Sequence, residues 1–372
     1  MKANNTILRK LTALTLTAGL VLTGCGSAKN DTAEQTTGSA AQTTASTEKA
    51  ETSAQTTSVT ETEETSTSEK KELTTVRYAV MTGNPTQWVA IIGDEQGIWA
   101  DHGIQIEISE FAAGIGTVDA VTTGQADIGF VTDFAGVNRI GASQGKSDLR
   151  FFTETSKSSS YNLYANPETV TSLEDLEGKN IITALGTFIE YLNGVTLEQA
   201  GLTEEDVEYK PIESPTDVLA LVETKQADAY WASGETARRL AEAGWEIIAN
   251  QQDIGIETYS LAVSTQTYLD ENADTVKEFL EAVNEINDFI ADNTDEAAAI
   301  VSKSTGIGEE VFKNNLAAID SKQEFTKDAY DTLQLINEWA RSNGFYETEF
   351  DIKDFIHTDA LAEVSPEDVN WQ

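Results

Sequence analysis

The sequence is poor in cysteine, histidine and basic residues. It has one Cys, two His, and 24 Lys or Arg against 63 Asp or Glu among 372 residues, for a formal net charge of −39 at pH 7. So acidic a surface argues against nucleic-acid binding and against membrane binding through a basic patch. A single thiol, Cys25, excludes intrachain disulfides, cysteine-ligated zinc and thiol catalysis in the rest of the chain. His102 and His357 lack the spacing of a metal-ligand pair, so neither a metal nor a cofactor is expected.

A long hydrophobic run is also missing near the N-terminus. The apolar stretch Leu11–Leu22 is well below the ~18 residues that a helix needs to cross a bilayer. Basic residues precede it, as in a signal peptide, here over residues 1–24. The stretch runs into Leu22-Thr23-Gly24-Cys25, which resembles the lipobox of bacterial lipoproteins. The resemblance implies lipidation of Cys25 and a lipid anchor on the extracytoplasmic face of the cell membrane, as in Gram-positive bacteria. An ordinary secretory signal with an incidental cysteine is the alternative.

Residues 25–72 and 73–372 differ sharply in composition. After Cys25 the first segment is Thr, Ser, Ala, Gln and Glu with no aromatic residue. Such a composition cannot bury enough apolar surface to offset chain entropy, which predicts a disordered tether. Formal charges of +3 on residues 1–24 and −5 on residues 25–72 leave −37 of the total −39 for the remaining 300 residues. A body of that length suits one large or two medium domains.

The body alternates strand-like and helix-like segments from Thr74 to Ala262, which predicts an α/β fold with parallel sheets and helices on both faces. From Glu271 onward the pattern is helical, with further helices near 294–303, 308–318 and 326–343. A helical stretch is also expected from Ser172. The predicted strands are 76–81, 104–111, 126–131, 149–155, 181–185, 207–212, 227–232 and 245–249, and the predicted helices between them include 86–103, 116–124, 189–201 and 215–225.

The tripeptide Gln-Ala-Asp occurs twice, at Gln125–Asp127 and at Gln226–Asp228, and an aromatic residue follows each alanine by four positions. Each copy lies where a predicted helix ends and a strand begins. In open α/β sheets, ligands bind beyond the opposite, carboxyl ends of the strands. The two aspartates are therefore expected to be structural, and the residues that follow these strands are expected to face a ligand. Those residues are Thr132, Asp133, Trp231, Ser233 and Glu235.

Two motifs suggest enzymes but have the wrong context. Gly141–Gly145 fits the G-x-S-x-G spelling of a hydrolase, yet a helical stretch precedes it and a strand follows, the reverse of the order required. Gly114–Asp119 resembles a dinucleotide fingerprint, but Asp119 occupies the place of the third glycine. Neither a serine hydrolase nor a nucleotide-binding protein is expected.

Four stretches together resemble type II solute-binding proteins of ABC importers, in the branch that includes binders of nitrate, aliphatic sulfonates, taurine and thiamine-precursor pyrimidines. They are EQGIWADHGIQIEI (95–108), AVTTGQADIGFV (120–131), SLEDLEGKNII (172–182) and VLALVETKQADAYWA (218–232). The resemblance implies two doubly wound lobes, 73–162 plus 260–372 and 166–256, joined by crossing strands near 161–165 and 258–264. It also implies a monomer that delivers a small molecule to ABC permease subunits and is not an enzyme. A pyrimidine synthase of the same fold uses a cysteine-rich segment that this chain lacks.

The family position of the ligand site, between loops at strand ends, implies a set of contact residues here. Aromatic rings with carboxylates favour a planar heterocycle or an amine over a bare anion, although sulfonate and nitrate stay open. Tyr191 and the nearby cation Lys157 are further candidates for the wall. A ligand-sensing module that presents its closed form to a receptor is the alternative function. The predicted ligand-binding residues are Asn84, Gln87, Trp88, Gly114, Gly116, Thr117, Asp133, Thr187, Phe188, Glu190, Trp231 and Glu235.

Overall fold

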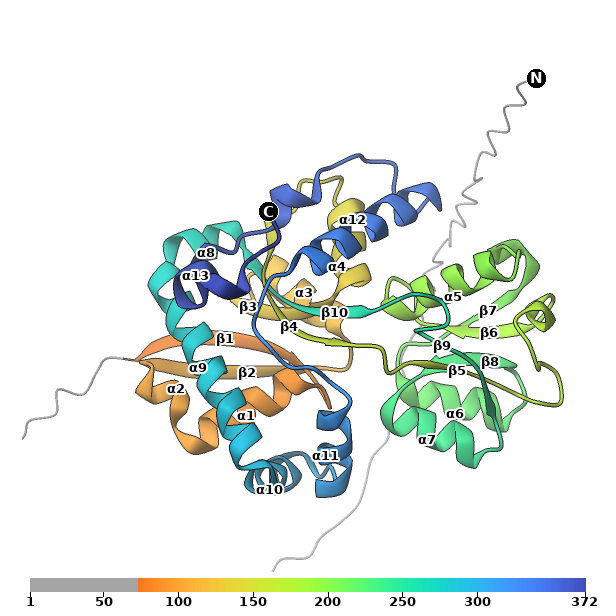
Figure 1. The fold of residues 1–372 in the computed structure, drawn as a ribbon, viewed down its shortest axis with the longest axis horizontal. Coiled ribbons are helices and arrows are strands. Elements are labelled where there is room, and N and C mark those ends of the chain that lie inside the picture. Colours follow the sequence, from red (N-terminus) through yellow and green to blue (C-terminus); the bar gives the residue numbers. More distant parts are fainter. Residues whose placement is uncertain (1–72) are drawn as a thin grey trace, which may run out of the picture. The chain divides into compact units, whose positions relative to one another are not determined.

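A computed structural model describes residues 73–372. The predicted signal peptide, the lipidation site Cys25 and the tether lie outside the described residues. Strands form two separate five-stranded sheets (Figure 1). Lobe 1 is the part built on the first sheet, in the order β2-β1-β3-β10-β4. Its strands are β1 (Thr74–Met81), β2 (Ile104–Phe111), β3 (Ile128–Thr132), β4 (Leu149–Ser158) and β10 (Thr258–Thr265).

Lobe 2 is the part built on the second sheet, in the order β7-β6-β8-β5-β9. The two lobes are joined where β4 leads into β5 and where β9 leads into β10 (Figure 1). The strands of lobe 2 are β5 (Asn162–Ala165), β6 (Asn180–Thr183), β7 (Glu208–Pro211), β8 (Ala229–Ala232) and β9 (Glu246–Asn250).

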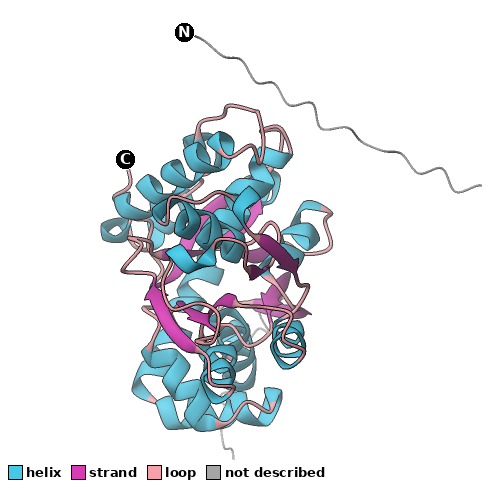
Figure 2. Ribbon diagram, turned by 90° about the vertical axis from the view of Figure 1, so that its right-hand side faces the viewer, coloured by secondary structure: helices cyan, strands magenta, loops and turns pink. Residues whose placement is uncertain are grey.

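Helices flank both sheets, and Figure 2 shows them gathered outside the strands. The expected α/β class with two doubly wound lobes is confirmed. No helix among residues 73–372 combines the length and apolar character needed to cross a membrane. The α-helices of lobe 1 are α1 (Pro85–Gln96), α2 (Ile98–Asp101), α3 (Gly114–Thr122), α4 (Asp133–Ala142), α8 (Gln266–Glu271), α9 (Ala273–Asp292), α10 (Thr294–Thr305), α11 (Glu309–Ala317), α12 (Lys327–Ser342) and α13 (Asp359–Val364). Those of lobe 2 are α5 (Phe188–Gln199), α6 (Pro215–Glu223) and α7 (Gly234–Glu242).

The sheets are mixed rather than parallel, which corrects the sequence-based expectation. Strands β1, β2 and β3 are parallel, but β10 runs antiparallel to both β3 and β4. In the second sheet β5 is likewise antiparallel to β8 and β9. These two strands are the ones that enter a sheet from the other lobe, so they arrive from the opposite direction to the strands of the local strand-helix-strand units.

Each repeated aspartate fastens two neighbouring parallel strands. The Asp127 carboxylate accepts the backbone N–H of Arg77 on β1 at 2.9 Å, and the Asp127 N–H donates to the Arg77 carbonyl at 2.9 Å. Asp228 makes the same pair of bonds with Asn180 on β6, at 2.9 and 2.8 Å. The structural role predicted for the Gln-Ala-Asp repeat is confirmed, because each copy joins the start of one strand to its parallel neighbour in its own lobe.

One predicted helix is wrong. The segment beginning near Ser172 forms only a 3₁₀ turn, Glu174–Leu176. The Asp175 side chain accepts the N–H groups of Thr171 and Ser172, which closes the turn locally. Gly178 follows with φ of +71°, a left-handed conformation that ends a helix. The chain therefore turns directly into β6.

Candidate functional site

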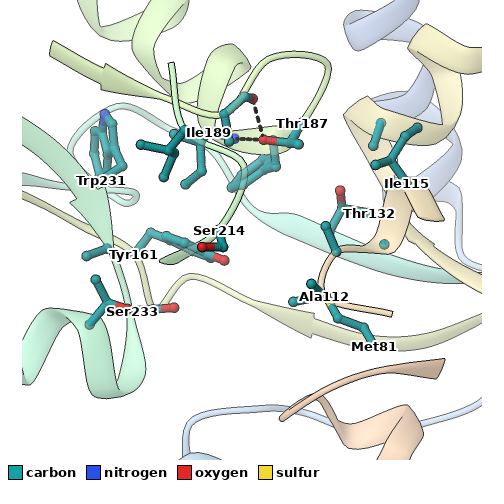
Figure 3. Close-up of a pocket in the computed structure, with 18 of the residues that line it drawn as sticks. Met81, Ala112, Ile115, Thr132, Tyr161, Thr187, Ile189, Ser214, Trp231 and Ser233 are labelled. Atoms are coloured by element: carbon teal, nitrogen blue, oxygen red, sulfur yellow. Dashed lines mark hydrogen bonds between the residues drawn. The ribbon is translucent and has the colours of Figure 1, made fainter. Parts of the chain in front are cut away.

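A cavity of about 260 Å³, here called the first chamber, opens between the two lobes (Figure 3). Lobe 1 contributes residues at the carboxyl ends of β1, β2 and β3, including Met81, Ala112 and Thr132. Lobe 2 contributes residues at the carboxyl ends of β6, β7 and β8, including Thr187 and Ser233. In Figure 3 the labelled side chains of the two lobes face each other across the opening. This is the position at which open α/β sheets bind ligands.

Aromatic and aliphatic side chains dominate the walls of the first chamber. Tyr161 and Phe188 lie edge to face with their ring centroids 5.8 Å apart. Trp231 is fully buried, and its indole N–H donates to the Thr196 hydroxyl at 3.1 Å, so this side chain is packed within the wall. Among the described residues that line the chamber, Glu213 is the one charged side chain. The full lining is Met81, Ala112, Ala113, Gly114, Ile115, Phe130, Thr132, Ala135, Tyr161, Ala184, Thr187, Phe188, Ile189, Ile212, Glu213, Ser214, Tyr230, Trp231, Ala232, Ser233 and Thr236.

A second chamber of about 750 Å³ adjoins the first. It is also bounded by both lobes, with Asn84 and Asn315 from lobe 1 and Glu235 from lobe 2. Hydroxyl and amide groups are common on its walls. The two chambers have six lining residues in common, so they form one continuous cleft; these residues are Met81, Phe130, Thr132, Tyr161, Ser233 and Thr236.

Two of the predicted residues that line the cleft lie at helix N-termini. Asn84 caps α1, where its side-chain oxygen accepts the Thr86 N–H at 3.1 Å. Thr187 caps α5 by accepting the Ile189 N–H at 3.2 Å. Side-chain caps of this kind satisfy backbone donors that a helix leaves free at its start. Both side chains are therefore already engaged with their own helices.

Seven of the twelve predicted residues line the cleft. Gly114, Thr187, Phe188 and Trp231 line the first chamber, and Asn84, Trp88 and Glu235 line the second. The structure does not bring the other five to either chamber. Those five are Gln87, Gly116, Thr117, Asp133 and Glu190.

Three of those five stabilise the walls in lobe 1. The Gln87 side chain accepts the Gly83 N–H at 2.8 Å and so holds the loop after β1. The Thr117 hydroxyl is buried, accepts the Phe130 N–H at 3.0 Å and ties α3 to β3. A Cβ at Gly116 would approach the Phe111 ring to 2.8 Å, so this glycine permits close packing of α3 on β2.

The other two are carboxylates turned toward backbone groups. Asp133 is fully buried at the start of α4 and accepts the N–H groups of Phe134 at 2.6 Å and Tyr259 at 2.9 Å. Glu190 accepts the Gly186 N–H at 2.6 Å and braces the loop before α5. Burial raises the pKa of both groups, in the case of Asp133 to about 7.

Glu235 is in the wall of the second chamber but is already paired. Its carboxylate accepts bonds from Arg238 at 2.6 and 2.8 Å and from Arg239 at 2.9 Å. These bonds lower the pKa of Glu235 to about 2. Arg238 also lines the second chamber, and its guanidinium bonds Glu242 as well. Lys157, the cation expected nearby, instead lies 3.9 Å from Asp320 and lines neither chamber.

Asp133 predicts a pH dependence of stability. The pKa of Asp133 is about 7 in the folded protein, whereas its ordinary value is 3.8. At pH values between 3.8 and 7 the folded state therefore binds more protons than the unfolded state. Stability must then fall as pH rises, by about 1 kcal/mol between pH 6 and pH 7 for a group titrating at 7. Urea denaturation at the two pH values should show a larger loss in the wild type than in Asp133→Asn, by about 1 kcal/mol. Equal losses in both proteins would contradict this assignment.

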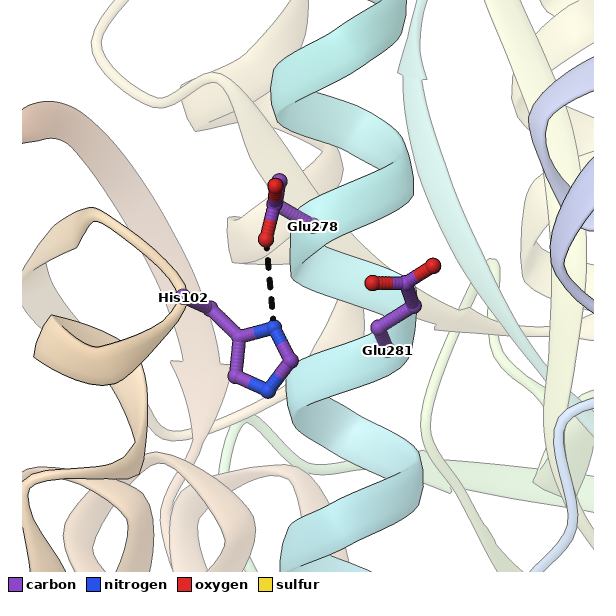
Figure 4. A group of neighbouring side chains, drawn as sticks. All are labelled: His102, Glu278 and Glu281. Atoms are coloured by element: carbon purple, nitrogen blue, oxygen red, sulfur yellow. Dashed lines mark hydrogen bonds and ion pairs between the residues drawn. The ribbon is translucent and has the colours of Figure 1, made fainter.

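One group of side chains in the described part of the chain could hold a metal ion (Figure 4). Ligand atoms of His102, Glu278 and Glu281 all lie within 4.8 Å of one another. The His102 ring is already engaged on both sides, with Nδ1 3.2 Å from Glu278 and Nε2 3.0 Å from Glu285. The arrangement ties the turn after α2 to α9, on a part of lobe 1 that lines neither chamber.

Several lining residues were not predicted from the sequence. Tyr161 belongs to a segment that was assigned to the crossing between lobes, with no role in the site. Glu213 and Ser214 lie just after β7, beyond Ile212, so their position relative to a strand end is like that of the residues expected at the site after β3 and β8. The wall formed by Ser156 and Ser158 on β4 and by Ser160 just beyond it has no signal in the sequence beyond alternate spacing.

Comparisons with known proteins agree on family and fold. The family described as NMT1/THI5 like matches residues 84–297. A protein of Brucella abortus named as a binding protein is 26% identical over 219 residues, which are 58% of this chain and 66% of that protein. The match thus spans slightly less than two thirds of the relative.

Solved structures with the same fold have low sequence identity to this chain. The periplasmic aliphatic sulphonate binding protein SsuA from Escherichia coli has a TM-score of 0.64 and 18% identity, covering 76% of this chain and 92% of its own. The alkanesulfonate-binding protein SsuA from Xanthomonas axonopodis pv. citri, bound to MOPS, has a TM-score of 0.65 and 15% identity, with coverage of 76% and 98%. The desulfurization enzyme DSZB has a TM-score of 0.58 and 15% identity, with coverage of 79% and 99%.

Proposed function

Because this chain belongs to the NMT1/THI5-like family, we propose that it is the solute-binding component of an ABC importer. It captures one small molecule in the cleft between its lobes and delivers that molecule to a membrane permease. The observation that carries this proposal is the continuous cleft lined by strand ends of both lobes. Residues 73–162 with 260–372 move as one body against residues 166–256, and closure about the two connections encloses the ligand.

The walls favour a planar heterocycle with N–H donors over a bare anion. The rings of Tyr161 and Phe188 line the first chamber, and an aromatic lining suits a planar ring. Its one charged residue, Glu213, is an acceptor of hydrogen bonds from N–H groups. Arg238, the cation in the second chamber, is already bonded to Glu235 and Glu242, so it is poorly placed to hold a sulfonate or nitrate.

Binding rather than catalysis is the proposed activity. The fold alone does not separate the two, because the desulfurization enzyme DSZB shares it. Among the described residues that line the first chamber there is no His, Lys or Cys, and Glu213 is the one carboxylate. Cys25 serves as the lipid anchor that keeps a monomeric protein on the extracytoplasmic face of the membrane, within reach of its permease.

A ligand panel tests the proposal. The purified protein is screened by thermal shift, and hits are measured by calorimetry, against taurine, methanesulfonate, nitrate, choline, cytosine, cytidine, adenine and adenosine. At least one heterocycle should bind in a 1:1 ratio and raise the melting temperature, because a ligand that binds only the folded state stabilises it. Binding of a sulfonate or nitrate alone would overturn the heterocycle assignment, and no binding by any compound would overturn the function.

A further inference from the structure

The second chamber has a floor of hydroxyl groups on the two strands that connect the lobes. Ser156 and Ser158 are alternate residues of β4, so they point to the same face of the sheet. Thr258 and Ser260 are alternate residues of β10, and the register places Ser260 opposite Ser156 and Thr258 opposite Ser158. All four line the second chamber, as does Ser160 just beyond β4.

Part of this floor has no hydrogen-bond partner within the protein. Among the described residues, neither the Ser156 hydroxyl nor the Ser260 hydroxyl has one, although Ser156 is only 7% exposed. By contrast, the Thr258 hydroxyl accepts a hydrogen bond from the Gln251 side chain at 2.9 Å, and the hydroxyl oxygens of Ser158 and Ser160 are hydrogen-bonded at 3.4 Å. Both hydroxyls line the second chamber and have donor and acceptor capacity left, so this pair is placed to bond a molecule that enters the chamber.

The charged side chains that line the second chamber, among the described residues, are already paired. Glu235 and Arg238 neutralise each other on the lobe 2 wall. The remaining polar wall consists of hydroxyls and the amides of Asn84 and Asn315, which are uncharged. Each hydroxyl both donates and accepts, which matches another hydroxyl better than it matches an anion or a cation.

We propose that the ligand has two parts: a planar ring in the first chamber and an uncharged hydroxylated substituent, such as a sugar or polyol chain, in the second. The inference rests on the proposed function and deepens it. The six residues common to both chambers leave the two spaces continuous, so one molecule can occupy both. Ser156 and Ser260 then act as specificity-determining residues for the substituent.

Matched pairs of compounds test this inference by calorimetry: cytosine with cytidine, and adenine with adenosine. In a pair that binds, the nucleoside should bind more tightly than the base. The double variant Ser156→Ala/Ser260→Ala should weaken nucleoside binding about three- to tenfold, because it removes one or two neutral hydrogen bonds to the substituent. Binding of the base should not change. Ser304→Ala is the control, since Ser304 is exposed on α10 and lines neither chamber.

Three results would overturn the inference and leave the function standing. A base could bind as tightly as its nucleoside, the double variant could bind the nucleoside as well as the wild type does, or neither pair could bind while another compound of the panel does. Failure of the whole panel to bind would instead overturn the proposed function, together with the inference that rests on it.

Discussion

Replacing Gly194 by alanine should lower the free energy of unfolding by about 2 kcal/mol, although alanine favours helices over glycine by about 1 kcal/mol. Gly194 lies within α5 of lobe 2, and a Cβ added there would overlap the indole ring of Trp339 on α12 of lobe 1. The clash outweighs the gain in propensity because the indole has little freedom to move away.

Trp339 is held from several sides. Its ring centroid lies 4.9 Å from that of Tyr191 and 5.5 Å from that of Phe345, and its indole N–H donates to Glu198 at 2.9 Å. Tyr191 in turn stacks on Phe134 at 5.3 Å, with 9° between the ring planes. Tyr191 was expected in the ligand wall, but it lines neither chamber and joins α5 to α4 instead. These rings form a contact between the lobes that is separate from the two chain connections.

A double-mutant cycle isolates this contact. In a Trp339→Ala background the ring is absent, so Gly194→Ala should become neutral or stabilise the protein by up to about 1 kcal/mol. Chemical denaturation of the four proteins gives the coupling. A similar destabilisation by Gly194→Ala in both backgrounds would contradict the assigned contact.

Much of the fold could be predicted because hydrophobic periodicity is local. The strictly alternating segment 104–111 is strand β2 at its observed bounds, and the helix expected over 189–201 is α5 within two residues. The resemblance to type II solute-binding proteins is confirmed by the family match and the shared fold. The antiparallel course of β5 and β10 could not be predicted, because it depends on which sheet a strand joins rather than on its own residues.

The site could be predicted in position but less well in its side chains. Residues that follow strands lie at the cleft, as the rule for α/β sheets requires. Whether such a side chain faces the cleft depends on competing partners elsewhere in the chain. Asp133 directly follows β3, yet its carboxylate turns to the Tyr259 N–H, 126 positions away in sequence. Glu235 reaches the wall but is paired within its own helix.

Replacing Ala112 by tryptophan should abolish ligand binding, weakening it at least 100-fold, while the protein stays folded. Ala112 is exposed in the loop after β2 and lines the first chamber opposite residues of lobe 2 (Figure 3). A large indole there would occupy space that the ligand needs and would block approach of the lobes. Because the side chain starts at an exposed position, its cost to folding should be within about 0.5 kcal/mol. Ala243→Trp is the matched control, since Ala243 is exposed at the end of α7 and lines neither chamber.

The most direct test of whether the cleft between the lobes is the ligand site is calorimetry. The panel compounds are titrated into the wild type, Ala112→Trp and Ala243→Trp. If the cleft is the site, we expect 1:1 binding of a heterocycle by the wild type and by Ala243→Trp, and no measurable binding by a folded Ala112→Trp protein. Undiminished binding by Ala112→Trp would contradict it, because a ligand that tolerates a tryptophan in the first chamber is bound elsewhere.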